Sequence, residues 1–316
     1  MPHPLYLRLS VTDRCNLACR YCRPEAAPAL AGPSPASEEE LLALVAAIEG
    51  QCGLRKVRLT GGEPLMHPDP PRLVARLHAR LPRADLALTT NAIRLRRYAK
   101  ALLAAGLTSL NISLDTPDAA TYAHLTRGGR LAEALDGIAA AREAGFRALR
   151  LNTVLLRTVN GHQLADLARL AAGLGCELRF IELMPTGEGA PRFAADFLPA
   201  DEALARLTEQ FDYVGPLPDS DTARRHRFLV RGCSQPLDVG FIAPVTQPFC
   251  GTCDRLRLDC RGRLYCCLRT EEGIDLLGPW RDGQPDEVCR RIRGAVEHKS
   301  PQRQTWPTRC MASLGG

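Results

Sequence analysis

The sequence has few aromatic residues, few lysines and no long hydrophobic run. Aromatic side chains make up 5% of its 316 residues, which leaves little surface for stacking nucleic-acid bases. Lysine occurs only at Lys56, Lys100 and Lys299, so nearly all positive charge is arginine, which favours bidentate contacts with phosphate. No apolar stretch approaches the roughly 18 residues of a membrane span, and the first ten residues do not have the pattern of a secretory signal. We therefore expect a cytoplasmic protein that binds neither membranes nor nucleic acid.

The composition is that of a globular enzyme. Hydrophobic residues make up 45% and charged residues 24% of the chain, and the formal net charge is a mild +6, which excludes a disordered or fibrous chain. The length suits one large domain and a smaller one, at about 150 residues per domain. The 13 cysteines stand in a chain without an export signal, so they favour metal binding or redox chemistry over disulfides.

Short apolar segments alternate with longer segments of helical period. We predict strands at Leu5–Val11, Lys56–Thr60, Asp85–Thr90, Ser109–Leu114, Arg147–Leu155 and Leu178–Leu183. We predict helices at Ser37–Glu49, Pro71–Leu81, Arg94–Ala105, Leu131–Gly145 and His162–Leu174. This βα rhythm indicates a parallel sheet with helices outside it. The expected fold is α/β, with a partial (βα)6 TIM-like barrel in residues 1–190 and a smaller α+β domain in residues 191–316 that closes it.

Three cysteines, Cys15, Cys19 and Cys22, follow the first predicted strand at CxxxCxxC spacing. Ligands bind at the carboxyl ends of strands in βα-repeat proteins. Three thiolates can hold three irons of a [4Fe–4S] cluster, and the next cysteine is Cys52, so one iron would stay open for a small ligand. The alternatives are a zinc ion completed by a distant residue, although zinc sites usually present paired CxxC units, or buried cysteines without a metal.

Polar residues follow the next three predicted strands. In "LTGGEPL", two glycines permit close approach of a ligand to the backbone, and Glu63 suits an ammonium group. "TTN" at 89–91 and "NISLD" at 111–115 end the third and fourth strands in polar side chains. Such turns and strand ends are also common in proteins that bind nothing there, so their weight comes from occurring together.

A second cysteine group lies in "FCGTCDRLRLDCRGRLYCCLR", residues 249–269. Cys250 and Cys253 form a CxxC, and Cys267 is the expected third ligand, with Cys260 and Cys266 as alternatives. A zinc ribbon would need a second CxxC, which adjacent Cys266 and Cys267 do not make. The group therefore predicts a second iron–sulfur cluster with an open iron.

Arginines recur in the middle of apolar strands. They stand at Arg8, Arg58 and Arg150 and in "LRF" at 178–180, and Arg255 and Arg257 are two residues apart in "CDRLRL", so they share one face of a strand. The arginines either lie over the helices with their charges in water or converge inside the barrel. Five guanidinium groups around one lumen, those of Arg8, Arg58, Arg150, Arg255 and Arg257, would suit a triphosphate.

These motifs resemble the radical SAM superfamily and, within it, the GTP 3′,8-cyclase family. The segments that carry the resemblance are "LRLSVTDRCNLACRYC", "VRLTGGEPL", "LTTN", "NISLD", "RFIELMPTG", "FCGTCDRLRL", "GRLYCCL" and the terminal "LGG". The resemblance implies a lyase that opens molybdenum cofactor biosynthesis by converting GTP to 3′,8-cyclo-7,8-dihydro-GTP. It implies two [4Fe–4S] clusters and S-adenosyl-L-methionine (SAM), whose cleavage gives the radical that removes the ribose C3′ hydrogen before C3′ attacks guanine C8.

The resemblance also implies roles for single residues. Cys15, Cys19 and Cys22 would hold the SAM cluster, and Tyr21, Gly62, Glu63, Ser113 and Met184 would line the SAM site. Cys250, Cys253 and Cys267 would hold the second cluster, whose open iron binds guanine. Arg8, Arg58, Thr89, Arg150, Arg255, Leu256 and Arg257 would hold GTP, with Leu256 contributing only its backbone and Arg257 or Arg255 supplying a proton. Arg150 stands where the family is expected to have lysine, which alters the contact geometry.

The resemblance further implies partners and leaves two rivals. The partners would be a downstream cyclic pyranopterin monophosphate synthase, an unidentified reductant protein and a second copy in a homodimer, while Gly315 and Gly316 would enter the active site. One rival is a peptide-modifying radical SAM enzyme with an auxiliary cluster, which usually has more C-terminal cysteines and does not need the arginines. The other is a basic iron–sulfur or zinc protein that binds nucleic acid, which would show a basic and aromatic stripe.

Overall fold

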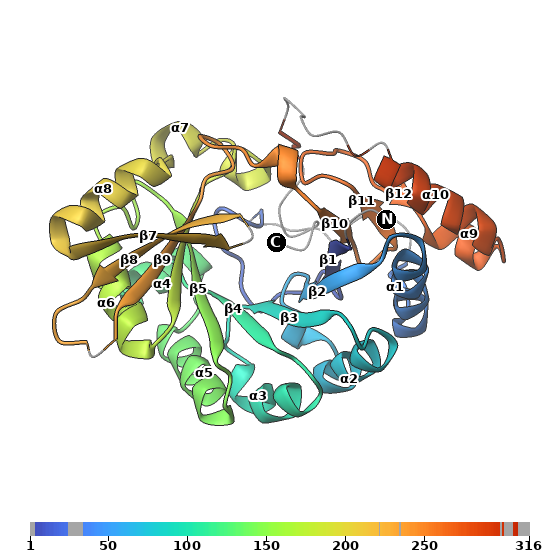
Figure 1. The fold of residues 1–316 in the computed structure, drawn as a ribbon, viewed down its shortest axis with the longest axis horizontal. Coiled ribbons are helices and arrows are strands. Elements are labelled where there is room, and N and C mark those ends of the chain that lie inside the picture. The colour runs from blue at the N-terminus through green and yellow to red at the C-terminus, as the bar shows by residue number, and fades with distance from the viewer. Residues whose placement is uncertain are drawn as a thin grey trace.

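The computed structural model describes residues 4–24, 34–220, 222–233, 235–297, 299 and 306–308. Its strands form one sheet that curves into an open barrel, with helices on the outer side (Figure 1). The strand order is β12-β11-β10-β1-β2-β3-β4-β5-β6-β9-β8-β7. No helix in this described part of the chain is long and apolar enough to cross a membrane.

Six parallel strands form the centre of the sheet, in chain order, and confirm the predicted α/β barrel. They are β1 (Leu5–Ser10), β2 (Leu54–Thr60), β3 (Asp85–Thr90), β4 (Ser109–Ser113), β5 (Ala148–Leu155) and β6 (Glu177–Glu182). The helices between them are α1 (Glu38–Cys52), α2 (Pro70–Arg80), α3 (Leu95–Ala104), α4 (Ala119–Thr126), α5 (Leu131–Ala144) and α6 (Leu164–Leu174), with a short 3-10 turn η1 (Pro64–Met66). The pattern missed only α4 among these helices, whose eight residues are too few to show a clear period.

The C-terminal residues extend the barrel at both edges. These elements are η2 (Gly187–Gly189), α7 (Phe193–Asp196), α8 (Ala200–Gln210), β7 (Asp212–Ser220), β8 (Ala223–Leu229), β9 (Leu237–Ile242), η3 (Cys250–Thr252), β10 (Arg255–Leu258), β11 (Arg263–Tyr265), β12 (Ile274–Asp275), α9 (Leu277–Arg281) and α10 (Pro285–Glu297). β9 pairs in parallel with β6, and β10 pairs in parallel with β1. The sheet therefore runs through the expected domain boundary near residue 190, which stays a prediction.

Side chains of the central strands alternate between the helices and the lumen. In β1, Leu7 and Leu9 are buried against the helices, where each apolar side chain contributes about 1.5–3 kcal/mol to folding. Tyr6 and Arg8 point the other way, because successive side chains of a strand face opposite sides, and both line the cavity inside the barrel. This alternation delivers one row of polar side chains per strand to the lumen.

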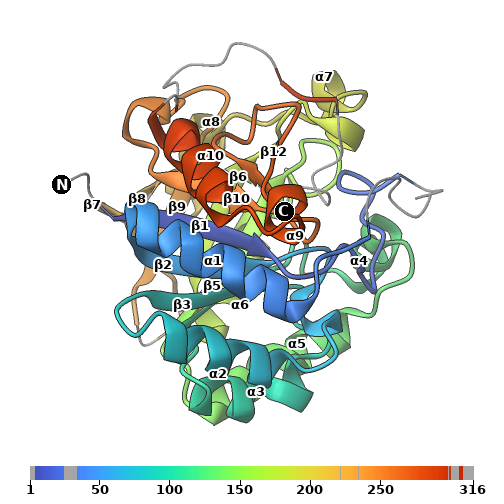
Figure 2. The same ribbon diagram turned by 90° about the vertical axis from the view of Figure 1, so that its right-hand side faces the viewer.

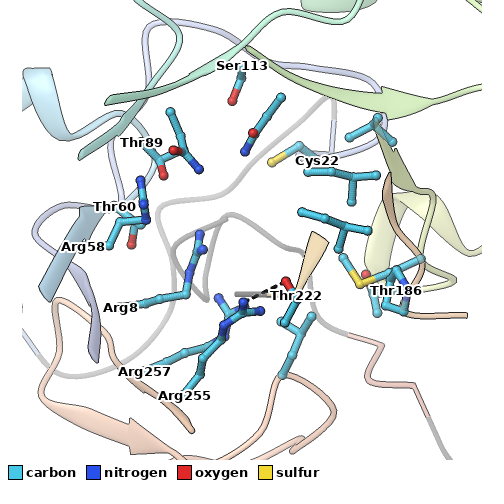
Figure 3. Close-up of a pocket in the computed structure, with 18 of the residues that line it drawn as sticks. Arg8, Cys22, Arg58, Thr60, Thr89, Ser113, Thr186, Thr222, Arg255 and Arg257 are labelled. Atoms are coloured by element: carbon cyan, nitrogen blue, oxygen red, sulfur yellow. Dashed lines mark hydrogen bonds between the residues drawn. The ribbon is translucent and has the colours of Figure 1, made fainter. Parts of the chain in front are cut away.

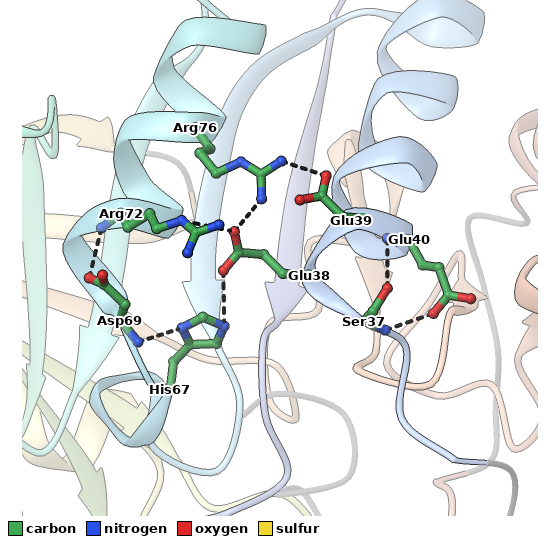
Figure 4. Close-up of polar contacts among 8 residues, drawn as sticks. All are labelled: Ser37, Glu38, Glu39, Glu40, His67, Asp69, Arg72 and Arg76. Atoms are coloured by element: carbon green, nitrogen blue, oxygen red, sulfur yellow. Dashed lines mark hydrogen bonds and ion pairs between the residues drawn. The ribbon is translucent and has the colours of Figure 1, made fainter.

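Polar contacts fix the first helices outside the barrel (Figure 4). Ser37 and Glu40 form a reciprocal capping box, with the Glu40 carboxylate accepting from Ser37 N at 2.7 Å. Glu38, in the next position, accepts from Arg76 of α2 and lies 3.8 Å from His67 Nε2. These contacts join the loop after β2 to α1 and α2. On its other side α1 lies beside α10, from the C-terminal part of the chain (Figure 2).

Candidate active site

A cavity of about 450 Å³ lies inside the barrel and collects nearly all of the predicted site residues. Its lining includes the first cysteine group, Cys15, Cys19 and Cys22, and from the second group Cys250, Cys253, Cys266 and Cys267. It also includes Arg8, Tyr21, Arg58, Gly62, Glu63, Thr89, Ser113, Met184, Arg255 and Arg257. Figure 3 shows the arginines and Cys22 facing this cavity from different sides. Two sites that are far apart in the sequence therefore form one chamber.

The first cysteine loop, residues 15–22, leaves β1 alongside the two glycines that follow β2. Gly62 N donates to Thr12 O and Glu63 N donates to Arg14 O, both at 2.8 Å. A Cβ atom at Gly62 would lie 2.4 Å from Arg14 O, which no side chain tolerates. Gly62 is therefore needed for a second reason besides the predicted approach of a ligand: a side chain there would collide with the backbone that leads into the first cysteine loop.

The three thiols of this loop lie near one another and near an acidic group. Burial raises the pKa of Cys19 well above its ordinary value, and the charges of Cys22, Asp115 and Cys15 raise it further. A bound metal would reverse this by deprotonating the thiols outright. Among the described residues, no three side chains of the metal-binding kinds converge closely enough to hold a single ion, so the cluster ligands stay predictions.

Tyr21 links the loop to the end of β4. Its hydroxyl donates to Asp115 Oδ2 at 2.7 Å, and Val154 N donates to Asp115 Oδ1 at 2.8 Å. Burial raises the pKa of Asp115 to about 6. The sequence pattern marks Asp115 only as the polar end of a strand, yet it lines the same cavity as Ser113 and Met184.

Glu63 is a buried junction between two strand ends. One of its oxygens accepts from Leu65 N at 3.0 Å and Thr90 Oγ1 at 2.7 Å, and the other accepts from Asn91 N at 2.8 Å. Burial raises its pKa to about 7, although these hydrogen bonds act in the opposite direction. Its predicted contact with an ammonium group would therefore add a positive charge where the carboxylate has been made costly.

We expect Glu63→Gln to change how stability depends on pH. Because the folded pKa is about 7 and the ordinary value is 4.5, the folded state binds the proton more tightly than the unfolded state between these pH values. The free energy of unfolding of the parent protein should therefore fall as pH rises through this window, by up to about 3 kcal/mol from Glu63. Asp115 titrates in both the parent and Glu63→Gln, so its contribution cancels when their free energies of unfolding are subtracted. Denaturant unfolding of the ligand-free parent and of Glu63→Gln at pH 5 and pH 8 measures this difference. If the free energy of unfolding changed equally with pH in both proteins, the prediction would be contradicted.

Three arginines form a row across adjacent parallel strands. Arg8 of β1 lies directly opposite Arg58 of β2 on one side and Arg257 of β10 on the other. Arg255, two residues earlier in β10, lies opposite Tyr6. Because all five side chains face the lumen, the prediction of arginines converging inside the barrel is confirmed for four of its five members.

The electrostatics of this row favour an anion. Burial lowers the pKa of Arg257 well below its ordinary value, and the charges of Arg8 and Arg255 lower it further. Burial likewise lowers the pKa of Arg8 to about 10. Burial would raise the pKa of Tyr6, but the surrounding guanidinium groups bring it down to about 8. A multivalent anion in the cavity would relieve this repulsion while accepting hydrogen bonds from several strands.

Two predicted GTP residues, Arg150 and Leu256, are not part of the described cavity lining. The Nε of Arg150 lies 3.4 Å from Glu177. Leu256 is fully buried on the outer face between the two arginines of β10. Arg179 of β6 instead lines the cavity, with its Nε donating to Glu177 at 2.6 Å. The "LRF" pattern contained this residue, but nothing in the pattern distinguished it from Arg150.

Several buried polar atoms of the lining have no hydrogen-bond partner in the described protein. They are the hydroxyls of Thr60, Thr89 and Thr186 and the side-chain carbonyl oxygens of Asn111 and Asn152. A buried polar group without a partner costs about 1–3 kcal/mol. These atoms therefore suit a ligand with several hydroxyl or amino groups, a description that fits the sugar and base parts of nucleosides.

Residues 9–171 match the Radical SAM superfamily, and residues 176–305 match Molybdenum Cofactor Synthesis C. The GTP 3′,8-cyclase of Heliobacterium modesticaldum is 40% identical over 98% of this chain and 97% of its own length. This chain belongs to the GTP 3′,8-cyclase family. The family member from Streptomyces coelicolor is 41% identical over 90% of this chain and 84% of its own length.

Solved structures agree on the fold. Streptococcus suis SuiB bound to its precursor peptide SuiA has a TM-score of 0.59 and 14% identity, covering 98% of this chain and 76% of SuiB. Native anSMEcpe with bound AdoMet has a TM-score of 0.51 and 14% identity, covering 66% of this chain and 60% of that one. At these identities the likeness concerns the radical SAM fold alone.

Membership of the Radical SAM superfamily implies a [4Fe–4S] cluster and SAM. The three thiols of the first cysteine loop, the acidic strand ends and the polar atoms without partners in the described lining fit them.

In this GTP 3′,8-cyclase family member, the second cysteine group contributes Cys250, Cys253, Cys266 and Cys267 to the cavity lining. Cys267 Sγ accepts from Arg269 N at 3.4 Å. Cys266, which directly follows β11 and also lines the cavity, donates its thiol to Ala295 O of α10 at 3.0 Å. Cys260 is buried outside the described lining, and burial raises its pKa to about 12.

Residues near the C-terminus also reach the cavity. Lys299 Nζ donates to Arg255 O and Cys266 O, both at 2.5 Å. The Arg269 guanidinium lies 3.9 Å from the ring centroid of Trp306. Lys299 and Trp306 line the cavity, and neither was predicted. Gly315 and Gly316, which were expected to enter the site, lie outside the described residues.

Proposed function

We propose that this protein cyclises GTP to 3′,8-cyclo-7,8-dihydro-GTP, the first step of molybdenum cofactor biosynthesis. The observation that carries the proposal is the single chamber, in which a row of three arginines faces the same cavity as two cysteine groups. Neither half alone would indicate this reaction, because radical SAM proteins act on many substrates and arginine rows bind many anions. Membership of the family supports the pairing of the two.

We assign the first cysteine loop to the cofactor side of the chamber. Cys15, Cys19 and Cys22 would ligate the [4Fe–4S] cluster, and Tyr21, Gly62, Glu63, Ser113 and Met184 would line the SAM site. When bound together, the cluster and SAM supply the radical that abstracts hydrogen from the substrate. These residues would position SAM and exclude water, and Glu63 would pair with the ammonium group of its methionine part.

We assign the opposite side of the chamber to GTP. Arg8, Arg58, Arg255 and Arg257 would hold the phosphates, and Thr89 would contact the nucleotide. We keep Arg150 and the Leu256 backbone as proposed contacts, although both lie outside the described lining. A second cluster on Cys250, Cys253 and Cys267 would bind the guanine ring. Cys267 is preferred because the sulfur of Cys266 is directed to α10. The Arg257 guanidinium, whose pKa is lowered by burial, is suited to deliver the proton that completes the product.

The decisive experiment follows products under anaerobic conditions. The protein is reconstituted with iron and sulfide, reduced with dithionite and incubated with SAM, with or without GTP. Mass spectrometry should detect deoxyadenosine together with a cyclic product derived from GTP. Deoxyadenosine without a GTP product would contradict the assignment of GTP and favour a different radical SAM substrate.

The peptide-modifying alternative is weaker but has one observation behind it. Streptococcus suis SuiB, which has a similar fold, was crystallised with a precursor peptide. At 14% identity that likeness carries no substrate, whereas a peptide would leave the arginine row without a purpose. We further propose that a separate synthase converts the product to cyclic pyranopterin monophosphate and that a reductant protein supplies electrons.

A further inference from the structure

The first cysteine loop is held from outside by the last turn of α4. Ala18 N donates to Thr126 O at 3.3 Å, and Arg20 N donates to Leu125 O at 3.0 Å. The Arg20 Nε also donates to His124 O at 3.0 Å. The last carbonyls of a helix have no donor within the helix. The loop therefore supplies the donors that α4 needs, and α4 supplies the acceptors that the loop needs.

Arg127 ends α4 in a backbone conformation that arginine rarely adopts. Its φ is 57° and its ψ is 55°, in the left-handed region. This conformation costs a non-glycine residue about 1–2 kcal/mol, although Gly128 and Gly129 follow immediately. The Arg127 Nη1 donates to Arg23 O, one residue beyond the loop, at 3.1 Å. A non-glycine residue kept at a strained position points to a use for its side chain.

A third contact holds the loop from the inner side. The Tyr21 hydroxyl donates to Asp115, which is fixed in turn by Val154 N. The loop is therefore held between β4 and β5 inside the barrel and α4 outside it. On the barrel side Asn91 Nδ2 also donates to Asn16 Oδ1 at 2.9 Å. Inside the loop itself Cys22 N donates to Cys19 O at 2.9 Å and Leu17 N donates to Cys15 Sγ at 3.4 Å, so most of the hydrogen bonds that fix the loop come from neighbouring elements.

We propose that the end of α4 is a clamp for the cluster loop and that Arg127 is its positioning residue. The proposal rests on the proposed function, which assigns these thiols to a [4Fe–4S] cluster. Arg127 is not part of the described cavity lining and acts through Arg23. Its role is to keep the three thiols at cluster-binding spacing, and so to slow the loss of iron from this site.

Arg127→Gly separates the clamp from the stability of the fold. Glycine removes the backbone cost of the left-handed conformation, which offsets the hydrogen bond lost with the side chain, so the melting temperature should change little. The cluster should nevertheless be lost to a chelator at least about fivefold faster, because a hydrogen bond from a charged group is removed. A contact that only stabilised the fold would lower both the melting temperature and iron retention together.

The experiment uses the reconstituted full-length protein. The reporter is the electron paramagnetic resonance signal of the reduced cluster that changes when SAM is added, followed over time with a chelator. Arg127→Lys keeps a charged donor and should behave as the parent. Arg130→Ala is the matched control, since its side chain is 76% exposed and pairs with Glu133 at 3.1 Å.

The outcomes distinguish the clamp from the function on which it rests. Equal rates of cluster loss in Arg127→Gly and the parent would overturn the clamp. If Cys15→Ala retains the SAM-responsive signal, the cluster assignment itself fails. Faster loss in Arg127→Gly, with parental rates in Arg127→Lys and Arg130→Ala, supports the clamp.

Discussion

Arg257→Ala should retain both clusters and lose the cyclised product. Arg257 lies in the row with Arg8 and Arg58, and its charge would be matched by phosphate oxygens in a site shielded from water. Removing one such charged donor from a reaction centre typically costs 100- to 1000-fold in rate. We therefore expect product formation to fall at least about 100-fold, measured by mass spectrometry under the conditions of the assay above.

The same variant should also reveal what the row does without ligand. Burial and the neighbouring arginines lower the pKa of Arg257, so removing it relieves repulsion, and the melting temperature without GTP should not fall. The rise in melting temperature caused by GTP should shrink, because a ligand stabilises only through its affinity for the folded state. Arg263→Ala on neighbouring β11 is the matched control, because Arg263 lies outside the described lining. Full product yield from Arg257→Ala would refute a required role.

The sequence pattern predicted the barrel because each strand and most helices carry their own local signal. The six central strands were placed within two residues at either end, since their apolar residues are packed between helices and lumen. The pattern could not predict that β9 and β10 join opposite edges of the same sheet. That pairing depends on contacts between segments far apart in the chain, and the sequence of a short strand does not indicate which strand it pairs with.

The sequence predicted the cysteine and glycine residues of the site more completely than the arginine residues. The cysteines and glycines follow strands at fixed spacings, so their placement at the cavity followed from the fold. Arg150 and Arg179 have the same local pattern and both contact Glu177, yet only Arg179 is part of the described cavity lining. The register of β5 against β6, which sets Arg150 opposite Glu177 and Arg179 opposite Asn152, is not readable from either segment alone. The α4 clamp could not be predicted, because its contacts run to backbone carbonyls, which carry no sequence signal.

Cys19→Ala should abolish deoxyadenosine formation. Cys19 is the middle thiol of the first loop, and the charges of both Cys15 and Cys22 act on it. Without it, two thiolates remain to hold a cluster that needs three protein ligands and an open iron. We expect iron content to fall by about half, because the second cysteine group keeps its cluster, and deoxyadenosine to stay at background with or without GTP.

Cys52→Ala provides the comparison for this result. Cys52 ends α1 and donates its thiol to Ile48 O at 3.1 Å, away from the cavity, so its loss should leave deoxyadenosine formation and iron content at parental values. Normal SAM cleavage by Cys19→Ala would remove the first cysteine group from the mechanism. The radical would then have to arise at the second group, where Arg255 and Arg257 lie, and the division of the chamber into a cofactor side and a nucleotide side would be wrong.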